Sequence, residues 1–345
     1  MVKAIEKPVI DFSEYPRIGA EDWNYTFETA KIRALEMGML SKSLLADMAN
    51  SGNFDAAMDL LGSSEYAIGQ GQRNFAEIEN VLLGRRSSVG KLFADLIKDD
   101  AIVELLGAKI DFTNLRLGLR RKLTDKEVGT DYRDDGNVAA DIFERILGEE
   151  NYGLFPEHMQ NAIERAVLAY YQDKQIRQID YAIDGVEAEY NIQRASELGS
   201  EFLLGLFRIR IDLINIRTMF RLKLTESEER NVFLDGGYIE IEQLKHGIDA
   251  GYEAMGQMFF ATPYCKMVEA GAEYAGSKGS FLMLEQKCDE YMAGYLKTTG
   301  QITAGPQPII AYLLMKENEI RRVRLVVTAK KNNLDASFVI DRIGG

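Results

Sequence analysis

Few residues of this chain are spaced as catalytic or ligand-binding residues usually are. The stretch Gly84–Lys91 comes nearest, because it approaches the glycine-rich loop that binds phosphates. Five residues instead of four separate its glycines, however, and Leu92 stands where Ser or Thr would bind magnesium. No strand pattern precedes the stretch. The sequence therefore argues against a nucleotide site here.

Cysteine, histidine and acidic residues give no clearer catalytic pattern. The two cysteines, Cys265 and Cys288, lie in helical patterns, where a thiol usually serves as a small buried side chain. They form no CxxC pair, which argues against a zinc site or a disulfide framework. The histidines, His158 and His246, read as ordinary helix residues. We predict no catalytic residue, no metal site and no cofactor.

Arginines spaced four apart are the most unusual charged feature. Arg116 and Arg120 form one such pair and Arg217 and Arg221 another, although the chain carries a net charge of −13. Like charges at this spacing on a helix repel by about 0.2–0.5 kcal/mol. Such pairs are expected either to bind carboxylates of their own domain, the simpler interpretation, or to face a partner. The candidate partner-binding residues are Arg116, Arg120, Arg217, Arg221 and Arg324.

These arginines lie on a sequence that occurs three times. The stretch Ile102–Leu123 recurs as Leu203–Leu224 and, more loosely, as Ile310–Lys331, which places Arg116, Arg217 and Arg324 at one repeat position. The spacing of about a hundred residues is the size of a small domain. We predict three similar helical domains, with these boundaries: 1–124, 125–230 and 231–345.

Each copy has the pattern of an amphipathic helix. In the first copy Phe112, Leu115, Leu119 and Leu123 recur at i, i+3, i+7 and i+11, which predicts one buried stripe. Alternating β-branched residues are almost absent from the chain, so the predicted fold class is all-α. A further helical pattern covers Thr29–Met48, after an extended lead-in over residues 1–22. The tetrads at 124–127 and 225–228 (TDKE and TESE) predict capping boxes at helix starts.

Composition narrows the possible partners. The chain has 345 residues, of which 46% are hydrophobic and 28% charged. Its acidic balance, with a pI of about 4.9, argues against general nucleic-acid binding and against tight docking on anionic lipid. No apolar run approaches the ~20 residues that span a bilayer, and the start lacks the apolar segment of a signal peptide. We expect a soluble protein whose contact with a membrane, if any, runs through another protein of a complex.

The third copy and its surroundings resemble a known family. The stretch Gly305–Leu334 (GPQPIIAYLLMKENEIRRVRLVVTAKKNNL) is similar to the C-terminal signature of the C subunits of V/A-type rotary ATPases, whose eukaryotic counterparts are the V-ATPase d subunits. Gly236-Gly237-Tyr238 and Thr262-Pro263-Tyr264 also match the family's pattern. The resemblance covers nearly the whole chain.

The resemblance implies a mechanical role. Members of this family are funnels of three similar all-helical domains around a pseudo-threefold axis. They are non-catalytic and sit on the cytoplasmic face of the membrane rotor ring as a socket for the central shaft, with ATP synthesis or hydrolysis coupled to proton or sodium transport. The implied partners are the central shaft subunits and the proteolipid ring. Two alternatives stay open: a stand-alone helical scaffold or adaptor, and an enzyme with an unrecognised acid pair.

Overall fold

The computed structural model describes residues 8–127 and 129–344, and the prediction of an all-α fold is confirmed. Helices account for 71% of the described residues, which contain no strand. The α-helices are α1 (Thr26–Glu36), α2 (Lys42–Asn50), α3 (Phe54–Leu60), α4 (Phe75–Leu96), α5 (Asp100–Leu123), α6 (Ala140–Glu149), α7 (Glu157–Asp173), α8 (Ile176–Glu197), α9 (Glu201–Leu224), α10 (Ile241–Asp249), α11 (Tyr252–Met258), α12 (Cys265–Lys278), α13 (Leu282–Thr298), α14 (Pro306–Lys331) and α15 (Ala336–Ile343). Short 3-10 helices cover Trp23–Tyr25, Gln70–Gln72, Tyr152–Leu154 and Thr299–Gln301.

The three copies of the repeated sequence form the three longest helices of the described chain. Helices α5 and α9 have 24 residues each and α14 has 26. Their apolar stripes are buried as predicted: Phe112, Leu115 and Leu119 in α5, and the equivalent residues in α9 and α14. The last predicted position of the stripe is not fully buried, because Leu123 is half-buried in α5 and Leu224 is exposed in α9.

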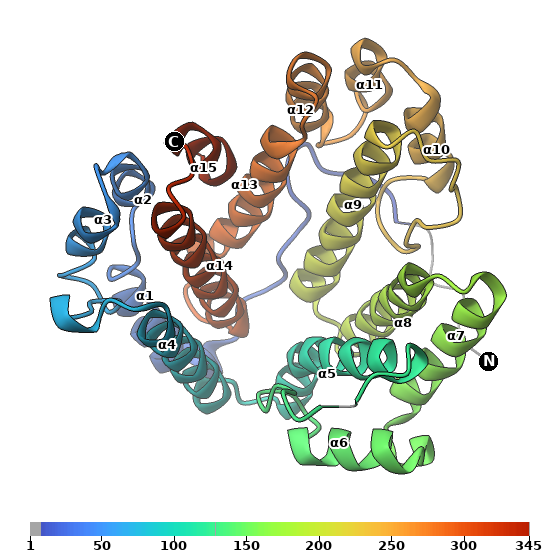
Figure 1. The fold of residues 1–345 in the computed structure, drawn as a ribbon, viewed down its shortest axis with the longest axis horizontal. Coiled ribbons are helices and arrows are strands. Elements are labelled where there is room, and N and C mark those ends of the chain that lie inside the picture. Colours follow the sequence, from blue (N-terminus) through green and yellow to red (C-terminus); the bar gives the residue numbers. More distant parts are fainter. Residues whose placement is uncertain (1–7, 128, 345) are drawn as a thin grey trace. The chain divides into compact units, whose positions relative to one another are not determined.

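The chain divides into two compact units. The first contains Asp99–Met219 and Glu228–His246, together with the described residues before Phe12; the second contains Phe12–Lys98, Phe220–Ser227 and Gly247–Gly345. In the first unit α8 packs against both α5 and α7 (Figure 1). In the second, α14 packs against α4 and α13 (Figure 1).

Each unit has an apolar core built around one of the long helices. In the first unit Phe112 and Leu115 of α5 pack with Phe143 of α6, Met159 of α7 and Ile183 of α8. In the second unit the buried side of α14 packs with helices from the start of the chain. That core contains Leu45, Met48, Ala57, Met58, Leu61, Tyr66, Ile78, Leu82, Ile320, Val323, Val326, Val327, Val339 and Ile343. The N-terminal helices α2–α4 therefore complete the core of α14.

Buried acids on the long helices hold the turns that precede neighbouring helices. The Asp111 carboxylate accepts the backbone N–H groups of Asn137 and Val138 at 3.2 and 3.0 Å. One repeat later the Asp212 carboxylate accepts those of Tyr238 and Ile239, both at 3.0 Å. The two copies thus share hydrogen bonds as well as an apolar stripe.

A buried amide repeats in the same way. Asn114 donates to the backbone oxygen of Arg133 at 2.7 Å and accepts its N–H at 2.9 Å. Asn215 makes the same pair of bonds with Leu234, both at 2.8 Å. Each side-chain amide donates one hydrogen bond to the loop backbone and accepts one from it, which fixes the loop against the helix.

In the third copy the turn comes from the start of the chain. Glu319, which aligns with Asp111 and Asp212, accepts the backbone N–H of Leu40 at 2.6 Å, just before α2. It also accepts the Tyr66 hydroxyl at 2.7 Å and an ion pair from buried Lys316 at 2.6 Å. Helix α2 therefore stands toward α14 as α6 stands toward α5.

Residues 8–22, the described part of the expected lead-in, contain no helix or strand, and the chain bends at residues 13–14. In the second unit Gln307 donates to the backbone oxygens of Ile18 and Ala20, at 3.2 and 2.9 Å. Tyr15 packs on Tyr291, with ring centroids 5.1 Å apart. Residues 1–7 lie outside the described residues.

Two local predictions are wrong. The helix expected over Thr29–Met48 is two helices, because α1 ends at Glu36 and the Ser41 hydroxyl caps α2 by accepting the Leu44 N–H at 3.1 Å. The expected capping boxes are helix ends instead. The hydroxyls of Thr124 and Thr225 donate back to the carbonyls of Arg120 and Arg221, at 2.7 and 2.9 Å. No helix starts at either tetrad in the described residues, since the next α-helices begin only at Ala140 and Ile241.

Candidate functional site

The first pair of candidate arginines lies opposite a row of carboxylates on α8. Asp180, Asp184 and Glu187 occur at i, i+4 and i+7, so they share one face of that helix. Arg120 binds Asp180 with both nitrogens of its fork, one of them at 2.8 Å. Arg116 forms a close ion pair with Asp184 and lies 3.6 Å from Asp180. These contacts join α5 to α8.

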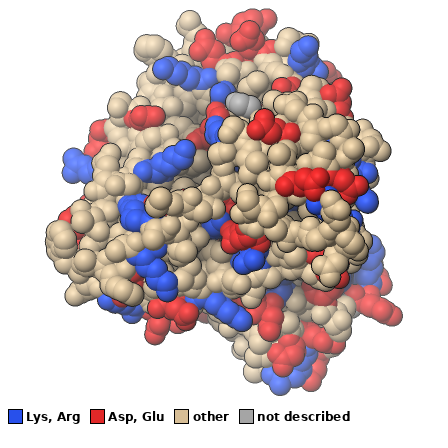
Figure 2. Space-filling view, turned by 90° about the vertical axis from the view of Figure 1, so that its left-hand side faces the viewer, with Lys and Arg blue, Asp and Glu red and all other residues tan. Residues whose placement is uncertain are grey.

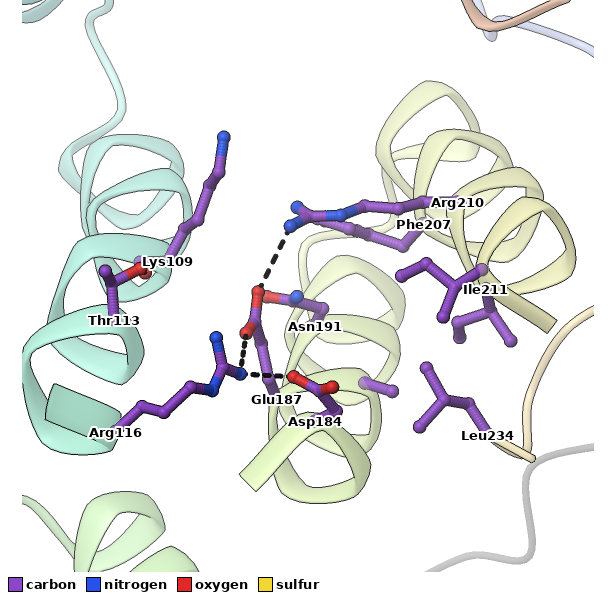
Figure 3. A pocket seen from close by; sticks show the side chains of 12 residues that line it. Lys109, Thr113, Arg116, Asp184, Glu187, Asn191, Phe207, Arg210, Ile211 and Leu234 are labelled. Atoms are coloured by element: carbon purple, nitrogen blue, oxygen red, sulfur yellow. Dashed lines mark hydrogen bonds and ion pairs between the residues drawn. The ribbon is translucent and has the colours of Figure 1, made fainter. Parts of the chain in front are cut away.

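Arg210 of α9 extends this row of charges to a third helix. Its guanidinium donates to the Glu187 carboxylate at 3.3 Å, while the other oxygen of Glu187 lies 4.0 Å from Arg116. Glu187 is thus shared by two arginines from different helices (Figure 3). The three helices α5, α8 and α9 are linked within one unit by an alternating chain of charges.

A cavity of about 230 Å³ opens beside this cluster. Its charged lining comes from three helices, with Arg116 on α5, Asp184 and Glu187 on α8, and Arg210 on α9 (Figure 3). Its apolar lining consists of these side chains: Phe207, Ile211, Ile214 and Leu234. Lys109, Thr113, Ala188 and Asn191 complete the lining.

Burial and charge shift two pKa values in the cluster. Burial raises the pKa of the Asp184 carboxyl, and the adjacent Arg116 guanidinium opposes that shift. The hydrogen bond to Asp180 raises the pKa of Arg120, so this guanidinium is held in its charged form. Arginines and carboxylates that pair in this way hold the three helices together.

The third copy carries an equivalent ion pair in the other unit. Arg324 of α14 binds Glu79 of α4 at 2.8 Å. Arg324 aligns with Arg116, and Glu79 aligns with Asp180 at the repeat spacing of 101, from 180−79. The pair therefore repeats a link between a long helix and the helix packed on it.

The second arginine pair is placed differently. Arg217 is half-buried on α9, and Arg221 is exposed near the end of the same helix. Among the residues that the structure describes, Arg221 has no carboxylate within ion-pair distance. Contact of any of the five arginines with a partner stays a prediction.

Sequence reasoning missed the carboxylates and Arg210. The spacing of Asp180, Asp184 and Glu187 could have indicated the acidic row, because residues at i, i+4 and i+7 share one face of a helix. Arg210 and its repeat equivalent Lys109 lie seven residues before Arg217 and Arg116, on the same faces. The basic stripes of α5 and α9 therefore begin seven residues before the first arginine of each pair.

The remaining candidate residues take structural positions. Gly84–Lys91 lies inside α4, and Cys288 is fully buried in α13. His158 stacks on Tyr190 with ring centroids 4.2 Å apart, and burial lowers its pKa. Across residues 8–127 and 129–344, no group of His, Cys, Asp and Glu is arranged to hold a metal ion.

On the face in Figure 2, basic side chains lie among acidic ones rather than in one basic field. No helix in the described part of the chain combines the length and the apolar character needed to cross a bilayer.

Comparison with known proteins gives the family. The chain is 22% identical to the C subunit of the V-type sodium ATPase of Enterococcus hirae, over 90% of this chain and 95% of that protein. It is 20% identical to the C subunit of the A-type ATP synthase of Methanococcoides burtonii, over 93% of this chain and 94% of that protein. The equivalent protein of Thermococcus kodakarensis is 23% identical, over 93% and 92%. The profile of one family matches residues 29–342, nearly the whole chain, and the chain therefore belongs to the ATP synthase (C/AC39) subunit family.

Proposed function

We propose that this chain is a non-catalytic rotor subunit of a V/A-type ATPase or ATP synthase, acting as the socket that couples the central shaft to the membrane rotor ring. Its partners are the shaft subunits and the proteolipid ring, and it sits on the cytoplasmic face of the membrane. The observation that carries the proposal is the family match over residues 29–342, together with relatives named as C subunits of such complexes.

The internal construction supports a part that transmits force. A coupling element must keep its shape under load, which favours long helices whose neighbours are fixed by buried polar contacts. Asp111 and Asp212 each hold a turn by two backbone bonds, and Glu319 holds one by a single bond. We further propose that the repeat arranges three similar domains in a pseudo-threefold funnel.

Copurification tests the proposal. A tagged chain expressed in its native host should recover shaft and ring subunits from detergent-solubilised membranes. Recovery of neither would contradict the socket function and favour the stand-alone scaffold.

A charge reversal refines the test. Arg221→Glu should reduce recovery of a partner while leaving the melting temperature unchanged, because no described carboxylate pairs with this side chain. Arg145→Glu is the matched control, since Arg145 is exposed on α6 and also has no ion pair among the described residues. Equal recovery with both variants would remove Arg221 from the interface.

A further inference from the structure

Helix α1 is fixed to the second unit by one of its sides. It packs on α14, and the side that it buries carries Thr29 and Ile32, each 1% exposed. The Thr29 hydroxyl donates to the carbonyl of Gly305 at 3.2 Å. Arg33 donates to the carbonyl of Thr299 at 2.6 Å. These contacts hold α1 in place, so its opposite side is a defined surface.

That opposite side exposes large apolar side chains. Trp23, in the 3-10 turn that runs into α1, is 65% exposed, and Phe27 is 73% exposed. Met37, at the end of the helix, is 89% exposed. Ala30 and Ala34 lie between them and are exposed as well. Single apolar side chains are common on protein surfaces, but a continuous row of them marks an interaction surface. We call these five residues the α1 stripe.

The spacing of the α1 stripe is that of a surface that binds a helix. Its members follow one another at intervals of four, three, four and three residues. This is the repeat of 3.5 residues that the a and d positions of coiled coils show, and it keeps one side of a helix facing a partner helix. Ala30 and Ala34 in the middle let a second helix come close, since the distance between packed helices depends on the side chains at the contact.

The charges beside the α1 stripe decide which kind of helix fits. In a coiled coil the residues that flank the apolar positions, called e and g, face charged residues of the partner. Lys31 and Arg33 hold such positions here. Arg33 already pairs with Glu36 at 2.9 Å, whereas Lys31 is exposed and makes no ion pair with any residue that the structure describes. A helix with a carboxylate opposite Lys31 would complete this contact.

A second copy of this chain supplies no such carboxylate. If two α1 stripes packed antiparallel about Ala30, each Lys31 would face the Lys31 of the other copy, and like charges repel. In a parallel pair the residue that faces Lys31 is the uncharged Thr26, five positions earlier. Charge therefore favours a different, acidic helix over self-association.

We propose that the α1 stripe is a docking surface for one amphipathic helix of another protein, whose apolar side packs on Trp23, Phe27 and Met37 and whose acidic flank faces Lys31. This surface goes beyond the rotor function, and the isolated chain suffices to test it.

Trp23 provides the measurement, because it is the only tryptophan of the sequence and its fluorescence reports on the stripe alone. The probe is a helical peptide without tryptophan, about three heptads long, with leucine at a and d and glutamate at e and g. Titrated into the full-length chain at constant ionic strength, it should shift the Trp23 emission to shorter wavelength until the site is saturated. A peptide with lysine in place of glutamate should bind about three- to tenfold more weakly, although the net charge of −13 attracts it.

Two substitutions separate the apolar contact from the charge. Phe27→Gln should weaken binding of the acidic peptide by at least about tenfold. Phe260→Gln is the matched control, since Phe260 is 83% exposed between α11 and α12, and it should leave binding unchanged. Lys31→Glu should reverse the preference, so that the lysine peptide binds more tightly. These side chains are exposed, and equal melting temperatures would show that each variant is folded.

Several results would overturn the proposal. The acidic peptide could leave the Trp23 emission unchanged, the two peptides could bind the wild-type chain equally, or Phe27→Gln could bind as tightly as the wild type. An emission shift that depends on the concentration of the chain alone would assign the stripe to a second copy. A shift with anionic lipid vesicles and none with the peptide would assign it to a lipid surface. Copurification with a rotary complex plays no part in these measurements, so its failure would count against the proposed function alone.

Discussion

At the residue scale, Asp111 in the first unit is a buried acid that constrains the residues around it. It is 1% exposed, and its carboxylate accepts two backbone N–H groups from the turn before α6. The turn passes so close that a Cβ on Gly136 would overlap the carboxylate, and Gly237 stands in the same relation to Asp212. Acid and glycine are therefore required together in both copies.

Replacing the acid should unfold the turn. Asp111→Ala leaves two backbone N–H groups without an acceptor and should lower the free energy of unfolding by about 2–4 kcal/mol. Denaturant titration followed by circular dichroism measures the change. Asp95→Ala, on an exposed position of α4, is the control and should have little effect. Equal stabilities for the two variants would show that the turn holds without Asp111.

The same carboxyl should give a measurable pH dependence. Burial raises the pKa of Asp111, and the hydrogen bonds from Val138 and Asn137 oppose the shift without cancelling it. The folded state then binds the proton more tightly than the unfolded state, in which the pKa is about 3.8. The unfolding free energy therefore falls as pH rises from near that value through the folded pKa.

Comparison with Asp111→Asn isolates this dependence from that of other carboxyls. The stability of the wild type minus that of the variant should decrease with rising pH in this window and become constant above it. Titrations at several pH values provide the measurement. A difference that increases with pH would mean that the hydrogen bonds outweigh burial.

At the scale of helices, one lysine position of the repeat has become a cap for a neighbouring helix. Lys223 donates to the backbone oxygens of Ile248 and Ala250, the first at 3.0 Å, at the end of α10. Lys330 donates to Ala49 and Ser51, at 3.0 and 2.5 Å, at the end of α2. In the first copy Lys122 binds the exposed Glu150 side chain instead, at 2.6 Å.

These contacts predict unequal losses. Lys223→Met and Lys330→Met should each lower the unfolding free energy by about 1–3 kcal/mol, because a charged donor satisfies two carbonyls that the helix itself leaves open. Lys122→Met serves as the matched comparison and should cost clearly less, since its ion pair is exposed to water. Melting temperatures of the three variants test the order. A loss for Lys122→Met as large as the others would contradict it.

The sequence predicted the long helices well and their contacts only in part. Stripes such as Phe112, Leu115 and Leu119 carry their own periodicity, so α5, α9 and α14 could be located without a structure. The partner of a charged side chain has no such signal. Arg116 gave no indication that Asp184 lay opposite, although the acidic spacing on α8 could have been found.

Contacts between residues far apart in the sequence could not be predicted from it. Glu319 and Leu40 are 279 residues apart, and nothing local links them. The tetrads that begin at Thr124 and Thr225 show a local error. Each marks a helix boundary, but this boundary is the end of the preceding helix and not the start of the next one.

At the scale of the molecule, the grouping of helices is set by the two cores. The core around α5 joins residues on both sides of position 124, from Ala108 to Val186. The core around α14 joins Leu45–Leu82 with residues from Ile320 onward. Each core therefore groups a long helix with the helices that come next in the order of the repeat. For α14, the last long helix, these are the helices at the start of the chain. The three boundaries expected from the repeat stay predictions.

This grouping can be tested by cutting the chain. A fragment of residues 1–98 should bind a coexpressed fragment of residues 99–345, because the second unit needs α2–α4 to cover the apolar side of α14. Val326→Asp in the longer fragment should abolish binding, since Val326 is fully buried in that core and an unpaired carboxylate there costs several kcal/mol. Leu325→Asp is the matched control on the same helix, at a position that is 37% exposed, and binding should persist. Affinity capture of one tagged fragment decides the matter: two fragments that never associate, or that associate equally well with Val326→Asp, would show that the N-terminal helices are not what completes the core of α14.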